Sequence, residues 1–266
     1  MSSIFARARW AAGTAPAART VADWFDPADR RGENLDLPVE DLQVEREAQR
    51  PPAPLTAEEL SRQEQVKLVQ RVFLTQSSKA RRAVLFAGVE RENGCAELCL
   101  RAGQTLARLT SQSVCVVDAN LRSPVLHQLV GADNREGLAA AVHQPGSASS
   151  FARRLEPANL WLLPSGASAS EPDLLLTAER ARPCLKALAG LFNRILIYAP
   201  PINLYAESLT LSQFVDGVVL VLAAHVTRRE IVRNIKDHLD DLNIPLLGLI
   251  LNDRTFPIPK AVYRLL

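Results

Sequence analysis

The sequence lacks several features that would assign it to common functional classes. No stretch reaches about 18 uninterrupted apolar residues, the usual length of a membrane-spanning helix, so no transmembrane segment is expected. Lys and Arg form no dense basic run and the net charge is only +2, so a nucleic-acid surface is not expected either. The first twenty residues have no long apolar core, which excludes a secretory signal and favours a cytoplasmic protein.

Cysteine and histidine are scarce, with four residues of each. The cysteines form no CxxC pair and lie mostly within or beside apolar segments, which predicts buried thiols in a reducing compartment rather than disulfides or zinc ligands. No histidine has a carboxylate or cysteine at metal-ligand spacing, so no metal site is expected. The residues concerned are Cys95, Cys99, Cys115, Cys184, His127, His143, His225 and His238.

What the sequence does contain divides into two parts. Residues 1–56 are rich in proline and charge without sustained periodicity, which predicts a flexible N-terminal segment. Trp10, Trp24 and Phe25 in this segment leave open a second hypothesis, that it tethers the protein to a membrane surface or a partner. The folded domain is expected over residues 57–266.

Helical signals mark both ends of this domain. Thr56 followed by Glu59 is a capping-box signature, and apolar residues then recur at helical spacing, so a helix is predicted from about Ala57 to about Leu74. Near the C-terminal end, Thr227 is expected to be the N-cap of another helix.

Short apolar runs alternate with helical stretches from Ala83 onward. Runs of this kind, rich in Val, Leu and Ile, are typical of parallel strands buried on both faces, and they predict a three-layer α/β/α domain with a mainly parallel sheet. Ligands of such a domain are expected at the carboxyl ends of the strands. The runs are "AVLFAG", "VCVVDA", "LWLLPSG", "ILIYAPP", "GVVLVLAA" and "LLGLILN".

The stretch "FAGVERENGCAELCL" has the spacing of a phosphate-binding loop. Gly88 and Gly94 stand six positions apart between a predicted strand and a predicted helix. In such a loop backbone N–H groups hold phosphate oxygens, a Lys reaches the β- and γ-phosphates, and a Ser or Thr binds magnesium. Here Cys95 and Ala96 occupy the places of the Lys and the hydroxyl residue. Taken alone, the stretch also fits an ordinary strand-to-helix connection.

Further motifs follow in order: "VCVVDANLRSPVLHQLVG", "NLWLLPSG", "ILIYAPPIN", "DGVVLVLAAHVTRRE" and "LLGLILN". Together with the loop they resemble the cytoplasmic ATP-binding domain of bacterial tyrosine kinases of capsule and exopolysaccharide systems, which are relatives of the Min- and Par-type P-loop ATPases. The resemblance extends from about Glu64 to Leu266. It implies a P-loop NTPase-like fold and a vestigial nucleotide site comprising Gly88, Arg91, Gly94, Cys95, Ala96, Asp118 and Asn252.

The sequence departs from this family's pattern at the residues that carry charge. The family's loop ends in Gly-Lys-Ser/Thr, its second motif is Asp-x-Asp-x-Arg, and its Walker B strand ends in Asp. Only Gly94, Asp118, Arg122 and two prolines match, because Cys95, Ala96, Asn120 and Tyr198 replace the rest. Phosphoryl transfer depends on positioned charge, so catalysis is expected to be lost. Glu90 and Glu92 would also repel phosphates unless Arg91 or Arg122 compensates.

The resemblance therefore predicts a catalytically impaired module that regulates or scaffolds exopolysaccharide or capsule synthesis. Its implied partner is a membrane-bound polysaccharide co-polymerase or chain-length protein, which would hold it peripherally at the inner membrane. The alternatives are an active ATPase or tyrosine kinase that uses Asp118 and Arg122, and a Min- or Par-type positioning protein. No cofactor is expected for the impaired site, and the alternative is ATP or ADP bound with weak or no magnesium dependence. Self-association stays open, because Glu64, Lys67 and Gln70 match the family's ring-forming Glu-x-x-Arg-x-x-Arg helix only in part.

Overall fold

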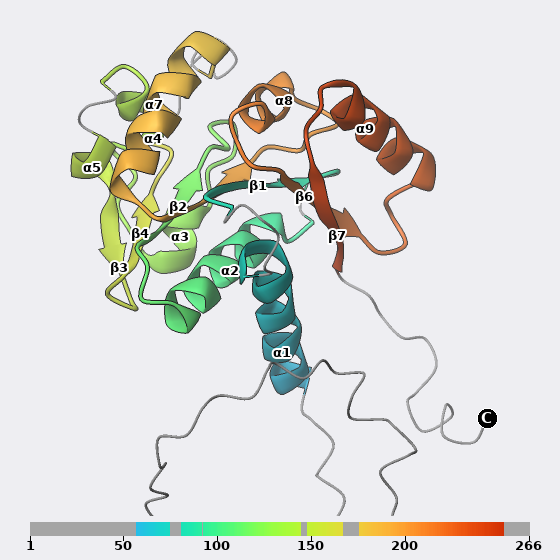
Figure 1. The fold of residues 1–266 in the computed structure, drawn as a ribbon, viewed down its shortest axis with the longest axis horizontal. Coiled ribbons are helices and arrows are strands. Elements are labelled where there is room, and N and C mark those ends of the chain that lie inside the picture. The colour runs from blue at the N-terminus through green and yellow to red at the C-terminus, as the bar shows by residue number, and fades with distance from the viewer. Residues whose placement is uncertain (1–56, 75–80, 92, 145–147, 167–175, 253–266) are drawn as a thin grey trace, which may run out of the picture. The chain divides into compact units, whose positions relative to one another are not determined.

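The computed structural model describes residues 57–74, 81–91, 93–144, 148–166 and 176–252. The N-terminal segment 1–56 lies outside these residues, so the predictions made for it stay predictions. Within the described residues, seven strands form one sheet in the order β3-β4-β2-β5-β1-β6-β7, and all neighbours are parallel except β3 and β4 (Figure 1). The strands are β1 (Ala83–Gly88), β2 (Val114–Asp118), β3 (Arg153–Leu155), β4 (Leu160–Leu163), β5 (Arg194–Ala199), β6 (Val218–Ala223) and β7 (Leu246–Asn252).

Helices cover both faces of the sheet and give the predicted three layers (Figure 1). One face carries α1 (Ala57–Val69), α2 (Cys95–Leu109) and α3 (Leu126–Val130). The other face carries α4 (Leu138–Ala141), α5 (Ala148–Phe151), α7 (Ala178–Leu191), α8 (Ala206–Ser212) and α9 (Arg229–Asp241). The predicted α/β/α class with a mainly parallel sheet is confirmed.

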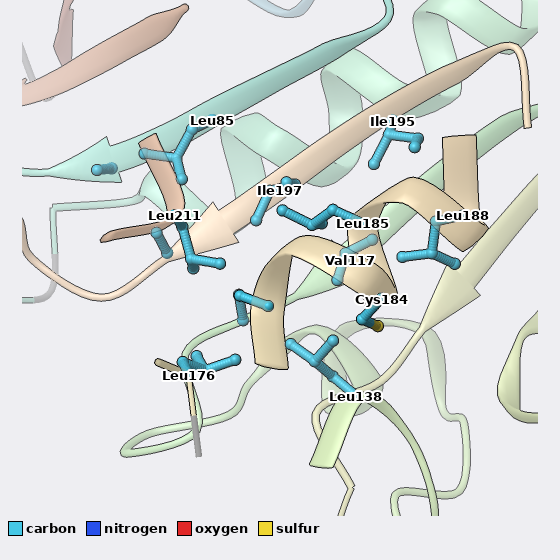
Figure 2. Packing of buried hydrophobic residues seen from close by; sticks show 14 of the residues in the cluster. Leu85, Val117, Leu138, Leu176, Cys184, Leu185, Leu188, Ile195, Ile197 and Leu211 are labelled. Atoms are coloured by element: carbon cyan, nitrogen blue, oxygen red, sulfur yellow. The ribbon is translucent and has the colours of Figure 1, made fainter. Parts of the chain in front are cut away.

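Alternate residues of each central strand supply the two hydrophobic cores. In β1, Leu85 and Ala87 face the α7 side, whereas Val84 and Phe86 face the α2 side, and all four are fully buried. Figure 2 shows the first core, in which Leu185 and Leu188 of α7 lie over the side chains of the neighbouring strands. Burial of apolar surface on both faces explains why these strands are continuous apolar runs.

Two elements differ from the expectation in detail. The predicted helix from Ala57 is confirmed, but its last turn, Gln70–Leu74, is π-helical and places Val72 and Phe73 in the α2-side core. The run "LLGLILN" forms β7, which is not buried on both faces as expected, because among the described strands it lies at the end of the sheet and pairs with β6 alone. An edge strand keeps part of its surface exposed whatever its composition.

Candidate functional site

The loop between β1 and α2 lies at the carboxyl end of the central strand. Gly88 ends β1, and Gly94, at φ +71°, precedes the first residue of α2. Gly94 therefore adopts the left-handed conformation that glycine tolerates best. The strand, the two glycines and the helix are arranged as the sequence predicts.

The interior of this loop is filled by the side chain of Asn93, which the sequence analysis did not single out. Asn93 is buried, its Nδ2 donates to the carbonyls of Glu90 (2.9 Å) and Val221 (3.2 Å), and its Oδ1 accepts from the backbone N–H of Cys95 (3.1 Å). A Cβ on Gly88 would lie only 1.8 Å from Asn93 Nδ2. The amide thus satisfies a backbone N–H at the start of α2, the kind of donor that holds phosphate in a P-loop.

Asn252, at the end of β7, lies against the same loop. Its Nδ2 donates to the carbonyl of Asn93 at 3.1 Å, and a Cβ on Gly94 would lie 2.3 Å from that nitrogen. The glycine therefore permits the last strand to approach the loop closely. This contact joins residues 159 positions apart in the chain.

Cys95 and Ala96, which stand where a P-loop has its Lys and its Ser or Thr, carry no charge. Cys95 and Ala96 are buried against the α2-side core, with 3% and 5% of their surfaces exposed. Burial raises the pKa of the Cys95 thiol well above its usual range, so the thiol is neutral. All four cysteines are free and buried, as predicted.

Asp118 ends β2, but its carboxylate is directed at backbone N–H groups. Its Oδ2 accepts from Val125 (3.1 Å) and Leu126 (3.0 Å), and its Oδ1 accepts from Asn120 (3.1 Å). Burial raises the pKa of Asp118 to about 7, although these hydrogen bonds favour the charged form. The carboxylate fixes the β2–α3 turn and the start of α3.

Tyr198 is the last but one residue of β5 and lies directly beside Asp118 in the parallel register. Its hydroxyl accepts a hydrogen bond of 3.0 Å from Asn120 Nδ2, and burial raises the pKa of the phenol. Two of the positions where the resemblance expects carboxylates are therefore occupied by a neutral phenol and a neutral amide bonded to each other.

Arg91 and Arg122 bring positive charge to the site, and both contact Tyr205. The Arg122 guanidinium lies 4.4 Å from the centroid of the Tyr205 ring, and its Nε binds Glu207 Oε1 at 2.8 Å. Arg91 donates to the Tyr205 hydroxyl. Glu207 is buried, with 3% of its side chain exposed, so Arg122 balances its charge.

Glu90 does not point freely into the space expected for phosphates. Its Oε2 accepts a 2.7 Å hydrogen bond from the Thr227 hydroxyl, which itself accepts from the backbone N–H of Ala223. The prediction that Thr227 is an N-cap is wrong, because the residue preceding α9 is Arg228 and the Thr227 hydroxyl is engaged by the loop and by β6.

A cavity of about 730 Å³ opens above these residues. Its lining includes Gly88, Arg91, Gly94, Cys95, Ala96, Arg122 and Asn252 from the predicted set, together with Asn93, Arg101, Tyr198 and Tyr205. Asp118 is not part of the lining. The charged groups of the lining are Arg91, Arg101, Arg122, Glu90 and Glu97, so the wall carries a small excess of positive charge.

The described residues contain neither a metal-binding cluster nor a helix that could span a membrane. No three His, Cys, Asp or Glu side chains among them are grouped so that they could hold a metal ion. Within the same residues, no helix is long and apolar enough to cross a bilayer.

Comparison with known proteins shows which sequences this chain is related to. No family model matches the chain. A tyrosine-protein kinase named ptk, from Acinetobacter johnsonii, is 27% identical over 152 residues, which are 56% of this chain and 21% of the relative. The chain is homologous to bacterial tyrosine-protein kinases. It spans about a fifth of that kinase's length.

Solved structures agree on the fold. The kinase domain of VpsO superimposes with a TM-score of 0.66 at 24% identity, over 74% of this chain and 98% of that domain. A ParA-family ATPase from Chlorobium tepidum gives a TM-score of 0.55 at 16% identity, over 65% of this chain and 74% of the other. The P-loop NTPase-like fold predicted from the sequence is confirmed.

Proposed function

We propose that this chain is a catalytically impaired relative of the bacterial tyrosine kinases and acts as a regulatory or scaffold module in exopolysaccharide or capsule synthesis. The observation that carries the proposal is the neutral character of its phosphate loop. Cys95 and Tyr198 stand where the kinases place a cation and a metal-binding carboxylate, and both are neutral and largely buried. The carboxylate of Asp118 is bonded to three backbone N–H groups.

The size of the expected loss follows from the chemistry of phosphoryl transfer. Catalysis of this reaction rests on positioned cations and metal-bound carboxylates, and one such charge contact is worth roughly 3 to 5 orders of magnitude in rate. The replacement of several of these charged residues at once should leave phosphoryl transfer without a useful rate. The Asn93 side chain adds a second obstacle, because it competes with phosphate for the N–H of Cys95.

A scaffold of this kind needs a partner that acts in the same process. From the resemblance we infer a membrane-bound polysaccharide co-polymerase or chain-length protein, which would recruit the chain to the cytoplasmic face of the membrane. The cavity would then serve recognition or hold the domain in one conformation.

One observation favours the alternative, an active enzyme with a non-standard ATP site. Arg91, Arg101 and Arg122 all line the cavity, and an anionic ligand would be attracted to them. In that case nucleotide would bind with weak or no dependence on magnesium.

Calorimetric titration with ATP and ADP, with and without magnesium, tests the proposal. We expect no heat of binding from the wild-type protein. The variant Cys95→Lys/Ala96→Thr/Tyr198→Asp restores the missing charges, and adding Asn93→Ala frees the N–H of Cys95. Magnesium-dependent binding that appears in the triple variant and strengthens in the quadruple variant would support a phosphate site lost by substitution.

Micromolar binding by the wild-type protein would overturn the proposal. The matched pair Arg91→Ala and Arg108→Ala then locates the ligand, because both remove one exposed arginine but only Arg91 lines the cavity. Binding lost in the first variant and kept in the second would establish the non-standard site. A phosphotransfer assay on the same proteins would show whether that site is active.

A further inference from the structure

The two edges of the described sheet differ in how they are protected against pairing with another strand. The β3 edge is three residues long and carries Arg153 and Arg154. The β7 edge is seven residues long, and its residues Leu249 and Leu251 are half exposed, at 51% and 52%. Short, charged edges resist further pairing, whereas long apolar edges invite it.

The backbone of β7 has a register that suits pairing with its own copy. The N–H of Ala224 donates to the carbonyl of Asn252 at 2.9 Å, so the backbone of Asn252 is directed toward β6. Because the backbone groups of successive residues alternate in direction, Ile250 is also directed toward β6, whereas Leu249 and Leu251 are directed away from it. The two outward-directed positions thus carry the same residue type and lie symmetrically about Ile250.

We propose that two copies of this chain pair through β7, antiparallel, around a two-fold axis at Ile250. Leu249 of each copy then lies opposite Leu251 of the other, so that both partners use the same surface, as in other isologous dimers. The sheets of the two copies become one continuous sheet. The proposal is independent of the function proposed above, because it rests on a strand edge and not on the phosphate loop.

The side chains on both faces of this pairing are apolar. In the parallel register with β6, Leu249 and Leu251 lie beside Leu220 and Leu222, which belong to the α7-side core. Residues directly opposite in an antiparallel pair share a face, so the half-exposed leucines of the two copies would cover one another there. On the other face the axis brings the two copies of Ile250 together, and β-branched residues suit such a position.

The charge order of α9 favours a second copy as the occupant of this edge. The helix dipole is complemented by acidic residues in the first turn and basic residues in the last. The charges of α9 run the other way, so they do not stabilise the helix by themselves. Glu230 and Lys236 reverse the sign at single positions without changing the balance of either half. The exposed residues concerned are Arg228, Arg229 and Arg233 at the beginning and Asp237, Asp240 and Asp241 at the end.

An antiparallel copy of α9 would complement this charge order. The helix connects the carboxyl end of β6 to the amino end of the parallel strand β7, so it runs antiparallel to β7. It packs on the same face as Leu220 and Leu222. A two-fold axis that relates two β7 strands therefore relates two α9 helices antiparallel on one face, with the basic end of each on the side of the acidic end of the other. Such complementarity favours the correct partner, because juxtaposed like charges are penalised.

Charge reversal tests this interface in the full-length protein. Sedimentation velocity over a concentration series should show a monomer–dimer equilibrium for the wild type. The variant Arg229→Glu/Arg233→Glu makes both ends of α9 acidic, and Asp237→Lys/Asp241→Lys makes both ends basic. Each variant alone should raise the dimer Kd at least about tenfold, and an equimolar mixture should recover the dimer, because an acidic helix then meets a basic one. The matched control Arg182→Glu/Lys186→Glu, exposed at the same spacing on α7, should leave the Kd unchanged.

Single cysteines test the register. Ile250→Cys places two thiols opposite each other across the axis, where the Cα atoms of a non-hydrogen-bonded antiparallel pair are about 4.5 Å apart, within the range that a disulfide spans. Leu251→Cys is more exposed but lies opposite Leu249 of the second copy. Mild oxidation should therefore give a disulfide-linked dimer from Ile250→Cys and little from Leu251→Cys. The four native cysteines are free and buried and should stay unreactive under native conditions.

Several results would overturn the proposal. Wild-type protein that sediments as a monomer at every concentration would do so, and slow hydrogen exchange at Leu249 and Leu251 in that monomer would identify another part of the same chain as the occupant. A dimer that the charge variants leave unchanged, a mixture that does not recover it, or equal disulfide yields from the two cysteine variants would show that association uses a different surface.

Discussion

A single amide organises the loop between β1 and α2. Asn93 bonds to Glu90, Cys95 and Val221, and it occupies the space above Gly88 that a side chain there would need. The side chain of Asn93 therefore stabilises the loop from within.

This arrangement predicts strong coupling between Gly88 and Asn93. Gly88→Ala alone should lower the free energy of unfolding by about 1–3 kcal/mol, because the new methyl group would overlap the Asn93 side chain. Asn93→Ala alone should lower it by about 1–3 kcal/mol through lost hydrogen bonds. The double variant should be clearly less destabilised than the sum, since the alanine at 93 removes the overlapping atoms. Denaturant unfolding of all four proteins measures the cycle, and additive effects would contradict the contact.

Asp118 gives the protein a specific pH dependence. Its pKa is about 7 in the folded state and 3.8 in a free side chain, so between these values the folded state holds a proton that the unfolded state has released. This contribution to stability is complete below pH 3.8 and falls as the pH rises to about 7, by at most ~1.4 kcal/mol per pH unit.

The variant Asp118→Asn cannot ionise and tests that dependence. The unfolding free energy of the wild-type protein minus that of the variant should decrease steadily from pH 4.5 to pH 7. Urea titrations at several pH values measure it. Parallel pH profiles for the two proteins would show that the carboxyl group does not titrate in this range.

Among the elements, α8 is tied to the turn after β2 by one partly buried ion pair. Arg122 in that turn binds the buried Glu207 in the first turn of α8 and packs on Tyr205, which immediately precedes the helix. The pair therefore fixes one wall of the cavity relative to another.

Replacement of Arg122 should lower the free energy of unfolding. Arg122→Ala would leave the Glu207 carboxylate buried without its cation, and we expect a loss of about 1–3 kcal/mol in unfolding free energy. Adding Glu207→Gln should recover part of the loss, because a neutral amide needs no cation. The control Arg135→Ala removes an exposed partner of Asp133 and should leave the thermal midpoint unchanged. Equal effects of the Arg122 and Arg135 substitutions would contradict this account.

The elements themselves were largely predictable from the sequence, and the site was predictable in part. Continuous apolar runs identified six of the seven described strands, because a sheet covered on both faces requires apolar residues at every position. The short β3 carries two arginines and was not predicted. The same pattern misjudged β7, since composition does not reveal which strand lies at an edge. Glycine spacing located the loop, but nothing in the local sequence indicated that Asn93 would turn inward. The roles of Tyr205, Thr227 and Glu207 depend on contacts between distant segments, which periodicity does not encode.

For the whole molecule, the proposed function predicts where the protein is found in the cell. In a strain with the complete polysaccharide locus, it should be recovered with the membrane fraction, and deletion of the co-polymerase gene should shift it to the soluble fraction. The comparison uses immunoblots of fractionated cells. A chain lacking residues 1–56 separates recruitment by the domain from tethering by the N-terminal segment. Continued membrane recovery without the co-polymerase would contradict recruitment by that partner.

The position of β1 in the sheet has a consequence for how the protein is made. This central strand is the first to be synthesised, yet both of its neighbours, β5 and β6, lie about a hundred residues or more further along the chain. At ~5–20 residues per second, a nascent chain would expose both edges of β1 for roughly 5–20 s before either partner leaves the ribosome. A strand that is almost wholly buried in the finished fold is therefore the one that waits longest for its neighbours, and ribosome-bound chains that stop before residue 194 should be the strongest chaperone clients.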